Sequence, residues 1–274
     1  MPRPTKLLVD NLQVYADLYF SNGINAPYHL KEGGDIEIKP VLLKDYPYYN
    51  NAVGILTLPK NEVNDIEIIR MSYLEYLIKV VFPSNKDYEM LMRYLLDLCL
   101  GAEYVAFMIK NNKPIIVICD KEQVVKHIIN SREFDDISEI ILNQNDAHYD
   151  NRTVNPEVRQ LMEDYYRIKY KDVSVPSLEK RKAFVSSKIG KTFKELGEYT
   201  CREFEEIYRA MLDSEIYMAT KITEASYKYE VKEQTKHPQY EPEKDRFEEI
   251  FSDTSVLKDK GFKGADNIGQ QFDD

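Results

Sequence analysis

The chain has 274 residues, of which 43% are apolar and 31% are charged. This length allows one or two domains with a buried core, and the composition is typical of a globular protein. Lysine and arginine number 37, whereas aspartate and glutamate number 47, so the net charge is −10. A general nucleic-acid-binding protein would carry a basic excess, so we expect no nucleic-acid partner. With 10 glycines and 12 prolines, a glycine-rich β-sandwich or a Rossmann enzyme is disfavoured.

The sequence also lacks the marks of a membrane protein, a secreted protein or a cofactor-dependent enzyme. No apolar run approaches the roughly 18 residues that cross a bilayer, and the N-terminal stretch has no signal-peptide pattern. Three widely spaced cysteines favour reduced thiols in a cytosol, and four scattered histidines predict no metal site. The segment Gly190-Lys191-Thr192 resembles the end of a phosphate-binding loop, but Val185 stands where that motif requires glycine. We therefore expect no cofactor.

Apolar periodicity divides the first hundred residues into several expected elements. Spacings of three and four residues predict helices, and strict alternation predicts a strand. Gly101 stands directly after the last of these helices, at a position that favours a left-handed residue. In chain order we expect a helix over 5–22, a strand over 35–39, mixed helix and loop over 42–58, a helix over 65–82 and a helix over 88–100.

The next residues contain the β-rich part of the sequence. Residues 104–109 and 114–118 are short apolar runs joined by the turn Lys-Asn-Asn-Lys, which predicts a β-hairpin. Asp120 and Gln123 have the spacing of a capping box, so a helix is expected to begin at Asp120. A further helix is predicted over 134–143.

The predicted fold class is α+β, mainly α-helical, with a small β-hairpin or sheet component and a flexible C-terminal tail. The polar stretch 143–155 is interpreted as a linker. In its C-terminal part the sequence predicts three helices, over 156–170, 177–189 and 200–231. We therefore expect three regions: an N-terminal α+β domain over 1–145, a helical domain over 156–231, and an acidic tail over 232–274.

The longest predicted helix begins with a capping box formed by Thr200 and Glu203. Apolar residues then recur at every third or fourth position for many turns. Such a stripe indicates either core packing or a contact surface for a partner helix, and the sequence leaves both interpretations open. The candidate partner-binding residues are Phe204, Tyr208, Met211, Ile222 and Tyr229.

Catalytic candidates are few. Asp120 follows a predicted strand, where an α/β enzyme often places an acid, but helix capping alone would also explain it. Neighbouring carboxylates such as Asp135 and Asp136 point about 100° apart on a helix and cannot form a facing acid pair. Because no nucleophile has a base beside it, we expect no catalytic residues and favour an interaction protein. The 21 tyrosines fit an interface-rich protein, although an AT-rich gene would explain them as well.

Three parts of the sequence resemble proteins encoded in the tail modules of phages and prophages of Gram-positive bacteria. Residues 35–46 (DIEIKPVLLKDY) are similar to a strand and turn that precede a helical region, here containing residues 71–77 (MSYLEYL). Residues 134–145 (FDDISEIILNQN) resemble a helix of the pattern F-[DE]-[DE]-[LI]-x-x-I-I-x-x-Q-N. Residues 200–211 (TCREFEEIYRAM), followed by 217–222 (YMATKI), resemble a later helix of these proteins.

The resemblance implies a non-catalytic tail morphogenesis protein, above all a tail assembly chaperone. Such a chaperone would hold helical segments of the tape-measure protein, or tube subunits, in the host cytoplasm while the tail polymerises. One alternative is a stoichiometric structural component of the tail or baseplate, which would remain in the virion. An alternative of another class is an enzyme or regulator that uses the Asp120 region. His237-Pro238 stands where these proteins carry a His-Trp segment, so the resemblance does not extend to the last forty residues.

Overall fold

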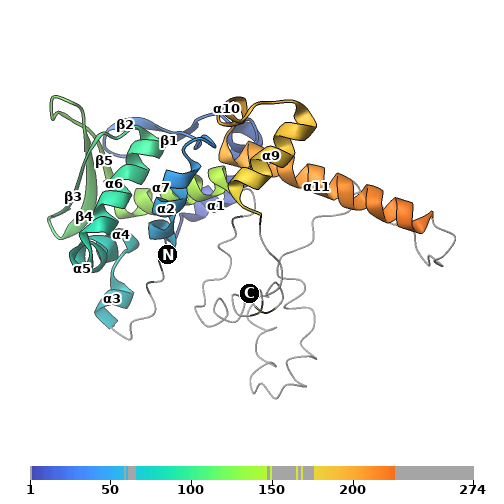
Figure 1. Ribbon diagram of the computed structural model, residues 1–274. Coiled ribbons are helices and arrows are strands. Elements are labelled where there is room, and N and C mark those ends of the chain that lie inside the picture. Colours follow the sequence, from blue (N-terminus) through green and yellow to red (C-terminus); the bar gives the residue numbers. More distant parts are fainter. Residues whose placement is uncertain are drawn as a thin grey trace, which may run out of the picture. The chain divides into compact units, whose positions relative to one another are not determined.

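A computed structural model of the chain describes residues 2–58, 60, 66–146, 149, 165, 168 and 176–225. It is mainly helical with two small antiparallel sheets, which confirms the predicted fold class (Figure 1). In chain order the elements are α1 (Lys6–Tyr15), η1 (Ala16–Phe20), β1 (Ala26–Leu30), β2 (Gly34–Ile38), α2 (Tyr46–Val53), η2 (Gly54–Thr57), α3 (Ile66–Arg70), α4 (Tyr73–Tyr76), η3 (Leu77–Val81), α5 (Phe82–Ser84), α6 (Lys86–Leu100), β3 (Tyr104–Lys110), β4 (Lys113–Cys119), β5 (Val125–Asn130), α7 (Ser131–Asn145), α9 (Leu178–Ile189), α10 (Phe193–Leu196) and α11 (Cys201–Glu224).

The chain forms two compact units that differ from the expected boundaries. Unit 1 combines an N-terminal stretch with a later one, and unit 2 takes the remaining two stretches: Met1–Pro156 with Ser174–Met211, and Glu157–Val173 with Leu212–Asp274. Helices α9 and α10 and the first turns of α11 therefore belong with the N-terminal elements. The predicted helix over 156–170 and the tail over 232–274 lie almost entirely outside the described residues.

Backbone hydrogen bonds explain why the start of α11 belongs to unit 1. The N–H of Leu43 donates to the carbonyl oxygen of Tyr199 (2.8 Å), and the N–H of Cys201 donates to that of Val41 (2.8 Å). An Arg202 Nη1–H group also donates to the carbonyl oxygen of Asn143 at 2.9 Å. These bonds use backbone groups that would otherwise be unpaired, so they fix α11 to the segment after β2.

The sheets confirm the predicted hairpin and correct the element expected after it. Strand β3 pairs with β4, and their turn places Asn111 and Asn112 at φ values of 50° and 60°, as a type I′ turn requires. The expected helix beginning at Asp120 is wrong, because a turn follows this residue and leads into β5. The Asp120 carboxylate accepts backbone N–H groups of the turn, and an aspartate can serve this purpose as readily as a helix cap. Strand β1, which pairs with β2, was also not predicted.

Several predicted helix boundaries are confirmed by their caps. Thr5 caps α1, Ser177 caps α9, and the capping-box bonds between Thr200 and Glu203 form at the start of α11. Helix α6 ends at Gly101, which has a φ of 66°. The single helix expected over 65–82 is instead divided, because the Ser72 hydroxyl accepts the N–H of Glu75 and caps a new helix there.

Helix α7 lies at the centre of unit 1 and is buried on nearly every side. Phe134, Ile137 and Ile140 join the main core, together with side chains from β2, β4 and α6. Most polar residues of α7 are also buried, and several bind the backbone of neighbouring segments. For example, the Asn145 side chain accepts the N–H of Val41 at 2.7 Å, and Gln144 donates to the carbonyl oxygen of Ile24 at 3.1 Å. Helix α7 therefore holds the segments before β1 and after β2, and the second of these also binds the start of α11.

Candidate functional site

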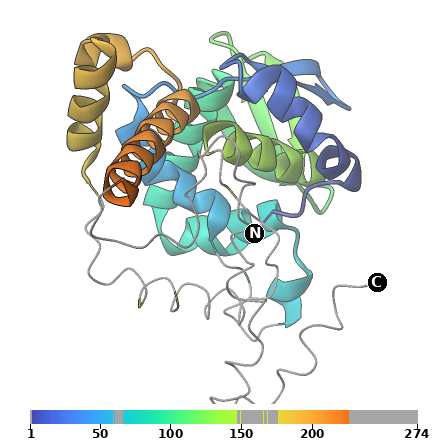
Figure 2. The same ribbon diagram turned by 90° about the vertical axis from the view of Figure 1, so that its right-hand side faces the viewer.

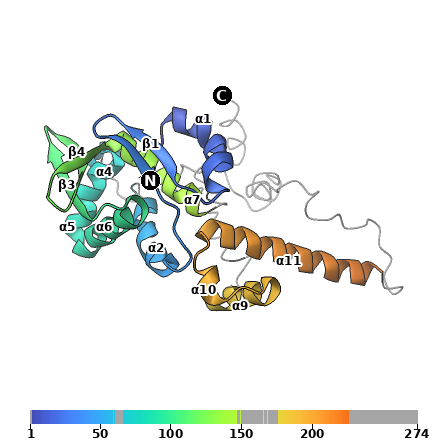
Figure 3. The ribbon, with the colours of Figure 1, turned by 90° about the horizontal axis from the view of Figure 1, so that it is seen from above.

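The first turns of α11 pack into unit 1. Phe204 and Tyr208 are only 1% and 8% exposed, and their rings stack with centroids 6.5 Å apart. Helix α9 covers them, since Phe184 meets the edge of Tyr208 at 5.9 Å and the Arg181 guanidinium lies over the Tyr208 ring. Figures 1 and 3 show α9 beside the beginning of α11, and Figure 2 shows the two helices with α11 seen nearly end-on. Arg181 further binds Glu205 at 2.6 Å, which fixes the two helices together.

This packing decides the role of two of the five predicted partner-binding residues. Phe204 and Tyr208 are core residues of unit 1, so they are not available to a partner helix in this structure. The expectation that they form part of a contact surface is corrected for this reason. Met211 is half-buried and Ile222 is exposed, whereas Tyr229 lies outside the described residues.

Beyond Met211 the same side of α11 stays apolar, and several of its side chains are exposed. Steps of four, four, three and three residues lead from Tyr208 through Leu212, Ile216 and Ala219 to Ile222, and such steps keep side chains on one side of a helix. Ile216 is 63% exposed and Ile222 is 71% exposed. We call Leu212, Ile216, Ala219 and Ile222 the distal apolar face.

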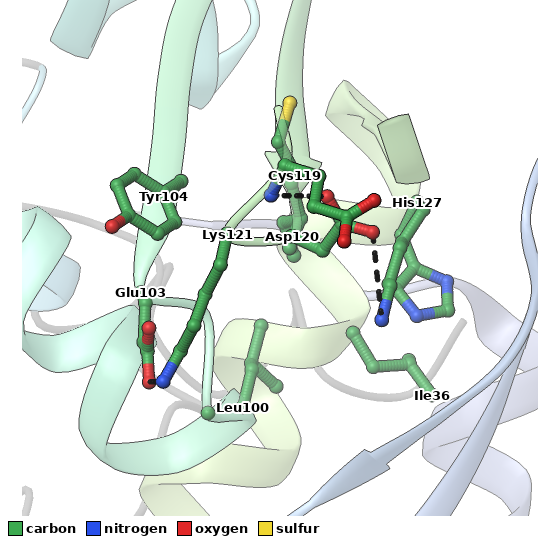
Figure 4. A pocket seen from close by; sticks show the side chains of 12 residues that line it. Ile36, Leu100, Glu103, Tyr104, Cys119, Asp120, Lys121 and His127 are labelled. Carbon is green, nitrogen blue, oxygen red and sulfur yellow. Dashed lines mark hydrogen bonds and ion pairs between the residues drawn. The ribbon is translucent and has the colours of Figure 1, made fainter. Parts of the chain in front are cut away.

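A second candidate site is a cavity of about 410 Å³ at one end of the β3–β4–β5 sheet (Figure 4). It contains the Asp120 region that the enzymatic alternative uses. Lysines and carboxylates pair within it, with Lys121 3.3 Å from Glu103 and Lys126 3.9 Å from Asp120. The cavity is lined by Ile36, Leu100, Gly101, Glu103, Tyr104, Ile118, Cys119, Asp120, Lys121, Glu122, Lys126 and His127.

The side chains around this cavity have structural partners that account for them. Asp120 Oδ1 accepts the N–H groups of Glu122 and Val124, both at 2.9 Å. His127 Nδ1 donates to the carbonyl oxygen of Gly33 at 2.8 Å. In Figure 4 the sulfur of Cys119 points away from the His127 ring, so these two do not form a nucleophile and base. The geometry therefore explains Asp120 as a turn residue and gives it no reacting partner among the described residues.

Two carboxylates of α7 bind other segments of unit 1, a role that the sequence did not predict. Asp136 accepts three hydrogen bonds, from the N–H and hydroxyl of Thr5 (2.6 and 3.0 Å) and from the hydroxyl of Tyr28 (2.9 Å). Glu133 accepts the N–H of Lys31 at 2.8 Å and completes the capping box with Asn130. Burial and the hydrogen bond to Asp136 raise the pKa of Tyr28 well above its usual value. The two carboxylates thus fasten the N-terminal helix and the first hairpin to α7.

Asp135 differs from its neighbour Asp136 because hydrogen bonds compensate only in part for the loss of water around its carboxylate. It is 9% exposed, and its Oδ1 has no hydrogen-bond partner among the described residues. Burial raises its pKa to about 7, against the lowering effect of the Arg3 backbone N–H. The nearby Lys60 ammonium lowers the pKa of Asp135 slightly, and the Asp135 carboxylate in turn raises the pKa of the Tyr73 hydroxyl. A buried carboxyl of this kind takes up a proton near neutral pH.

The cysteines have no reactive arrangement. Cys99 and Cys201 are buried and Cys119 is half-buried, and none forms a disulfide. Burial raises the pKa of the Cys201 thiol to about 12 and raises that of Cys99 as well, which disfavours the nucleophilic thiolate. Among the described residues, no group of three or more His, Cys, Asp or Glu side chains is arranged to hold a metal ion.

Comparisons with known proteins add no relative to this description. The chain matches no family model, and searches of curated proteins and of solved structures also gave no match. Of the helices that can be described, none has the length and apolar character needed to span a bilayer.

Proposed function

We propose that the chain is a non-catalytic phage tail morphogenesis protein, and specifically a tail assembly chaperone that binds helical segments of a tape-measure protein. The observation that carries the proposal is the distal apolar face of α11. Its exposed isoleucines continue the side of the helix that is covered in unit 1, so the helix offers a partner the same kind of surface that α9 already covers. The sequence resemblance supports the tail module as the source of that partner.

The mechanism is hydrophobic capture of an amphipathic helix. Leu212, Ile216 and Ile222 would pack against apolar side chains of the partner helix at spacings of three and four residues. Full burial of each such side chain contributes about 1.5–3 kcal/mol before the cost of association, so a few of them suffice for reversible holding. The net charge of −10 would keep the complex dissolved and would disfavour acidic partners.

The proposal is tested by changing the distal apolar face without touching the core. The double variant Ile216→Asp/Ile222→Asp places two charges on exposed positions. We expect its affinity for purified helical fragments of the tape-measure protein from the same phage genome to fall at least about tenfold, since two buried charges would have no partners. The matched control is Ala210→Asp/Ser214→Asp, which adds the same charges at exposed positions on the other side of α11. Equal binding by wild type and the double variant, with both melting at the same temperature, would contradict the proposal.

The structural alternative involves the same biology but predicts a different fate for the protein. A tail or baseplate component would remain in the particle at a fixed copy number, whereas a chaperone leaves before maturation. The binding experiment does not separate these two outcomes, because both use a partner-binding surface. Protein content of finished particles separates them.

A further inference from the structure

Strand β4 is apolar on both of its faces, although the described helices cover only one of them. Ile116 and Ile118 point into the main core, which also contains Val105 of β3 and Ile129 of β5. Ile115 and the alternating residue Val117 belong to the opposite face and are not part of that core. An antiparallel sheet with one face in water normally alternates apolar and polar residues along each strand. The second face of β4 therefore has the composition of a covered surface.

The strand register extends this apolar character across the whole sheet. Residues directly opposite one another share a face, which places Ala106, Val117 and Ile128 in a central row. Tyr104 and Val125 lie on one side of this row, and Met108 lies on the other. We call these six residues the outer sheet patch. Tyr104, Met108 and Val125 are 48%, 41% and 51% exposed, whereas Val117 is 7% exposed and Ala106 and Ile128 are half-buried.

Figures 1 and 3 show the sheet at a margin of unit 1, with α4, α6 and α7 on its other side. The contacts agree, because α4 and α7 both touch β4 while the core residues of β4 point towards them. Within the described part of the chain, the helices that contact β4 lie on the core side of the sheet.

Charges lie at the two ends of this patch with opposite sign. Lys110 and Lys113 stand at the tip of the β3–β4 hairpin, and both are exposed. At the other end lie Glu103, Asp120 and Glu122 with only two lysines, Lys121 and Lys126. The patch is therefore basic at one end, apolar in the middle and weakly acidic at the other end.

We propose that this patch binds a second copy of the chain, face to face, with the strands of the two copies running in opposite directions. The two-fold axis then lies between the sheets and perpendicular to the strands, along the row that contains Val117. This arrangement places the hairpin lysines of each copy over the acidic end of its partner, and apolar rows over apolar rows. The other two-fold arrangement, with parallel strands, would stack Lys110 and Lys113 on their own copies and is disfavoured by repulsion.

The size of the patch predicts a weak dimer. Three strands about 4.8 Å apart, with about seven residues at roughly 3.4 Å each, form a face on the order of 340 Å² per copy. Stable complexes bury about 800 Å² per partner, so we expect a dissociation constant between about 10 and 500 µM. A dimer of this kind appears only when the protein is concentrated.

Sedimentation of the full chain from about 5 to 500 µM tests the proposal, because this range brackets the expected dissociation constant. The wild type should shift from monomer to dimer with increasing concentration. The variants Met108→Lys and Val125→Lys, both at exposed positions, should weaken the dimer at least about tenfold. The matched control is Met90→Lys on α6, since Met90 is 62% exposed and lies outside the patch. A wild type that stays monomeric, a Met108→Lys variant that dimerises normally, or a Met90→Lys variant that loses the dimer would each overturn the proposal.

Charge reversal tests the orientation independently of the apolar contacts. Lys110→Glu/Lys113→Glu should weaken the dimer about threefold or more at low salt, and adding Glu103→Lys/Glu122→Lys should restore it. Circular dichroism and thermal melting verify that each variant folds. A four-residue variant that remains as weak as the two-lysine variant would exclude the antiparallel arrangement.

Discussion

Helices α7 and α11 both carry clear apolar stripes, yet they are buried to very different extents. Twelve of the 15 residues of α7 are buried, including Glu133, Asp135, Asp136 and Glu139, whereas only three of the 24 residues of α11 are. The difference lies in their partners. Strands and helices surround α7 on nearly every side, and their backbone groups bind several of its polar side chains. Among the described residues, α9 covers the first turns of α11.

An amphipathic pattern therefore does not by itself distinguish a core helix from a surface helix. In α7, carboxylates whose pattern is typical of a solvent-facing side accept hydrogen bonds from Thr5, Tyr28 and Lys31. In α11, isoleucines that would read as core are more than 60% exposed. A core helix needs its side chains for stability, whereas an exposed apolar side can change with little loss of stability. The following variants test that distinction.

The largest effect is expected for Phe204→Ala. The Phe204 ring is 1% exposed and stacks on Tyr208, so its removal leaves a cavity in unit 1. Loss of a buried phenylalanine costs about 3–5 kcal/mol of the free energy of unfolding. Chemical denaturation measures this loss directly. A change under about 1 kcal/mol would mean that α11 does not pack on unit 1 as described.

The next effect concerns pH and Asp135. Its folded pKa of about 7 lies above the ordinary value of 3.8, so the folded chain binds more protons between these two values. The free energy of unfolding should therefore fall as pH rises from about 4 to 7, by at most about 4 kcal/mol at 1.36 kcal/mol per pKa unit. Asp135→Asn removes the titrating group and should flatten this slope. Parallel pH profiles for wild type and Asp135→Asn would contradict the assignment.

Removal of the neighbouring Asp136 carboxylate should lower the free energy of unfolding by a smaller amount. Asp136→Ala leaves the N–H of Thr5 and the hydroxyl of Tyr28 without their acceptor. We expect a loss of about 2–3 kcal/mol near pH 7, together with faster hydrogen exchange in α1. Unchanged exchange at the backbone amides of α1 would show that Asp136 does not anchor that helix.

The smallest effect on stability is expected for Ile222→Ala. Because Ile222 is 71% exposed, its truncation should change the free energy of unfolding by less than about 0.5 kcal/mol. Binding to tape-measure fragments should nevertheless weaken, which is the reverse of the behaviour expected for a core residue. A stability loss comparable to that of Phe204→Ala would place Ile222 in a packed core.

Much of the fold could be predicted from local signals in the sequence. Gly101 and Gly190 mark helix ends, Thr200 and Glu203 mark a helix start, and the Asn-Asn turn marks the hairpin. These signals act within a few residues, so tertiary contacts do not override them. The element after Asp120 was mispredicted because an aspartate satisfies N–H groups in a turn and at a helix start in the same way. Strand β1 has a proline and a histidine, which conceal its alternation.

The candidate site was less predictable, because it depends on which side chains are covered by elements distant in the sequence. The apolar stripe of α11 is continuous in the sequence, and the point where burial ends is set by α9, about twenty residues earlier. In the same way, the apolar face of β4 could be recognised only after the register of three strands was known. Asp135 and Asp136 are adjacent in the sequence, but Asp136 accepts three hydrogen bonds, whereas Asp135 has an oxygen without a hydrogen-bond partner among the described residues.

The most direct test of the proposed chaperone role is quantitative mass spectrometry of an induced phage lysate and of particles purified from the same culture. The proposed role predicts that the protein is abundant in the lysate together with tape-measure protein and absent from finished particles. A fixed copy number in the particles would contradict the chaperone role and would identify a structural tail or baseplate component instead.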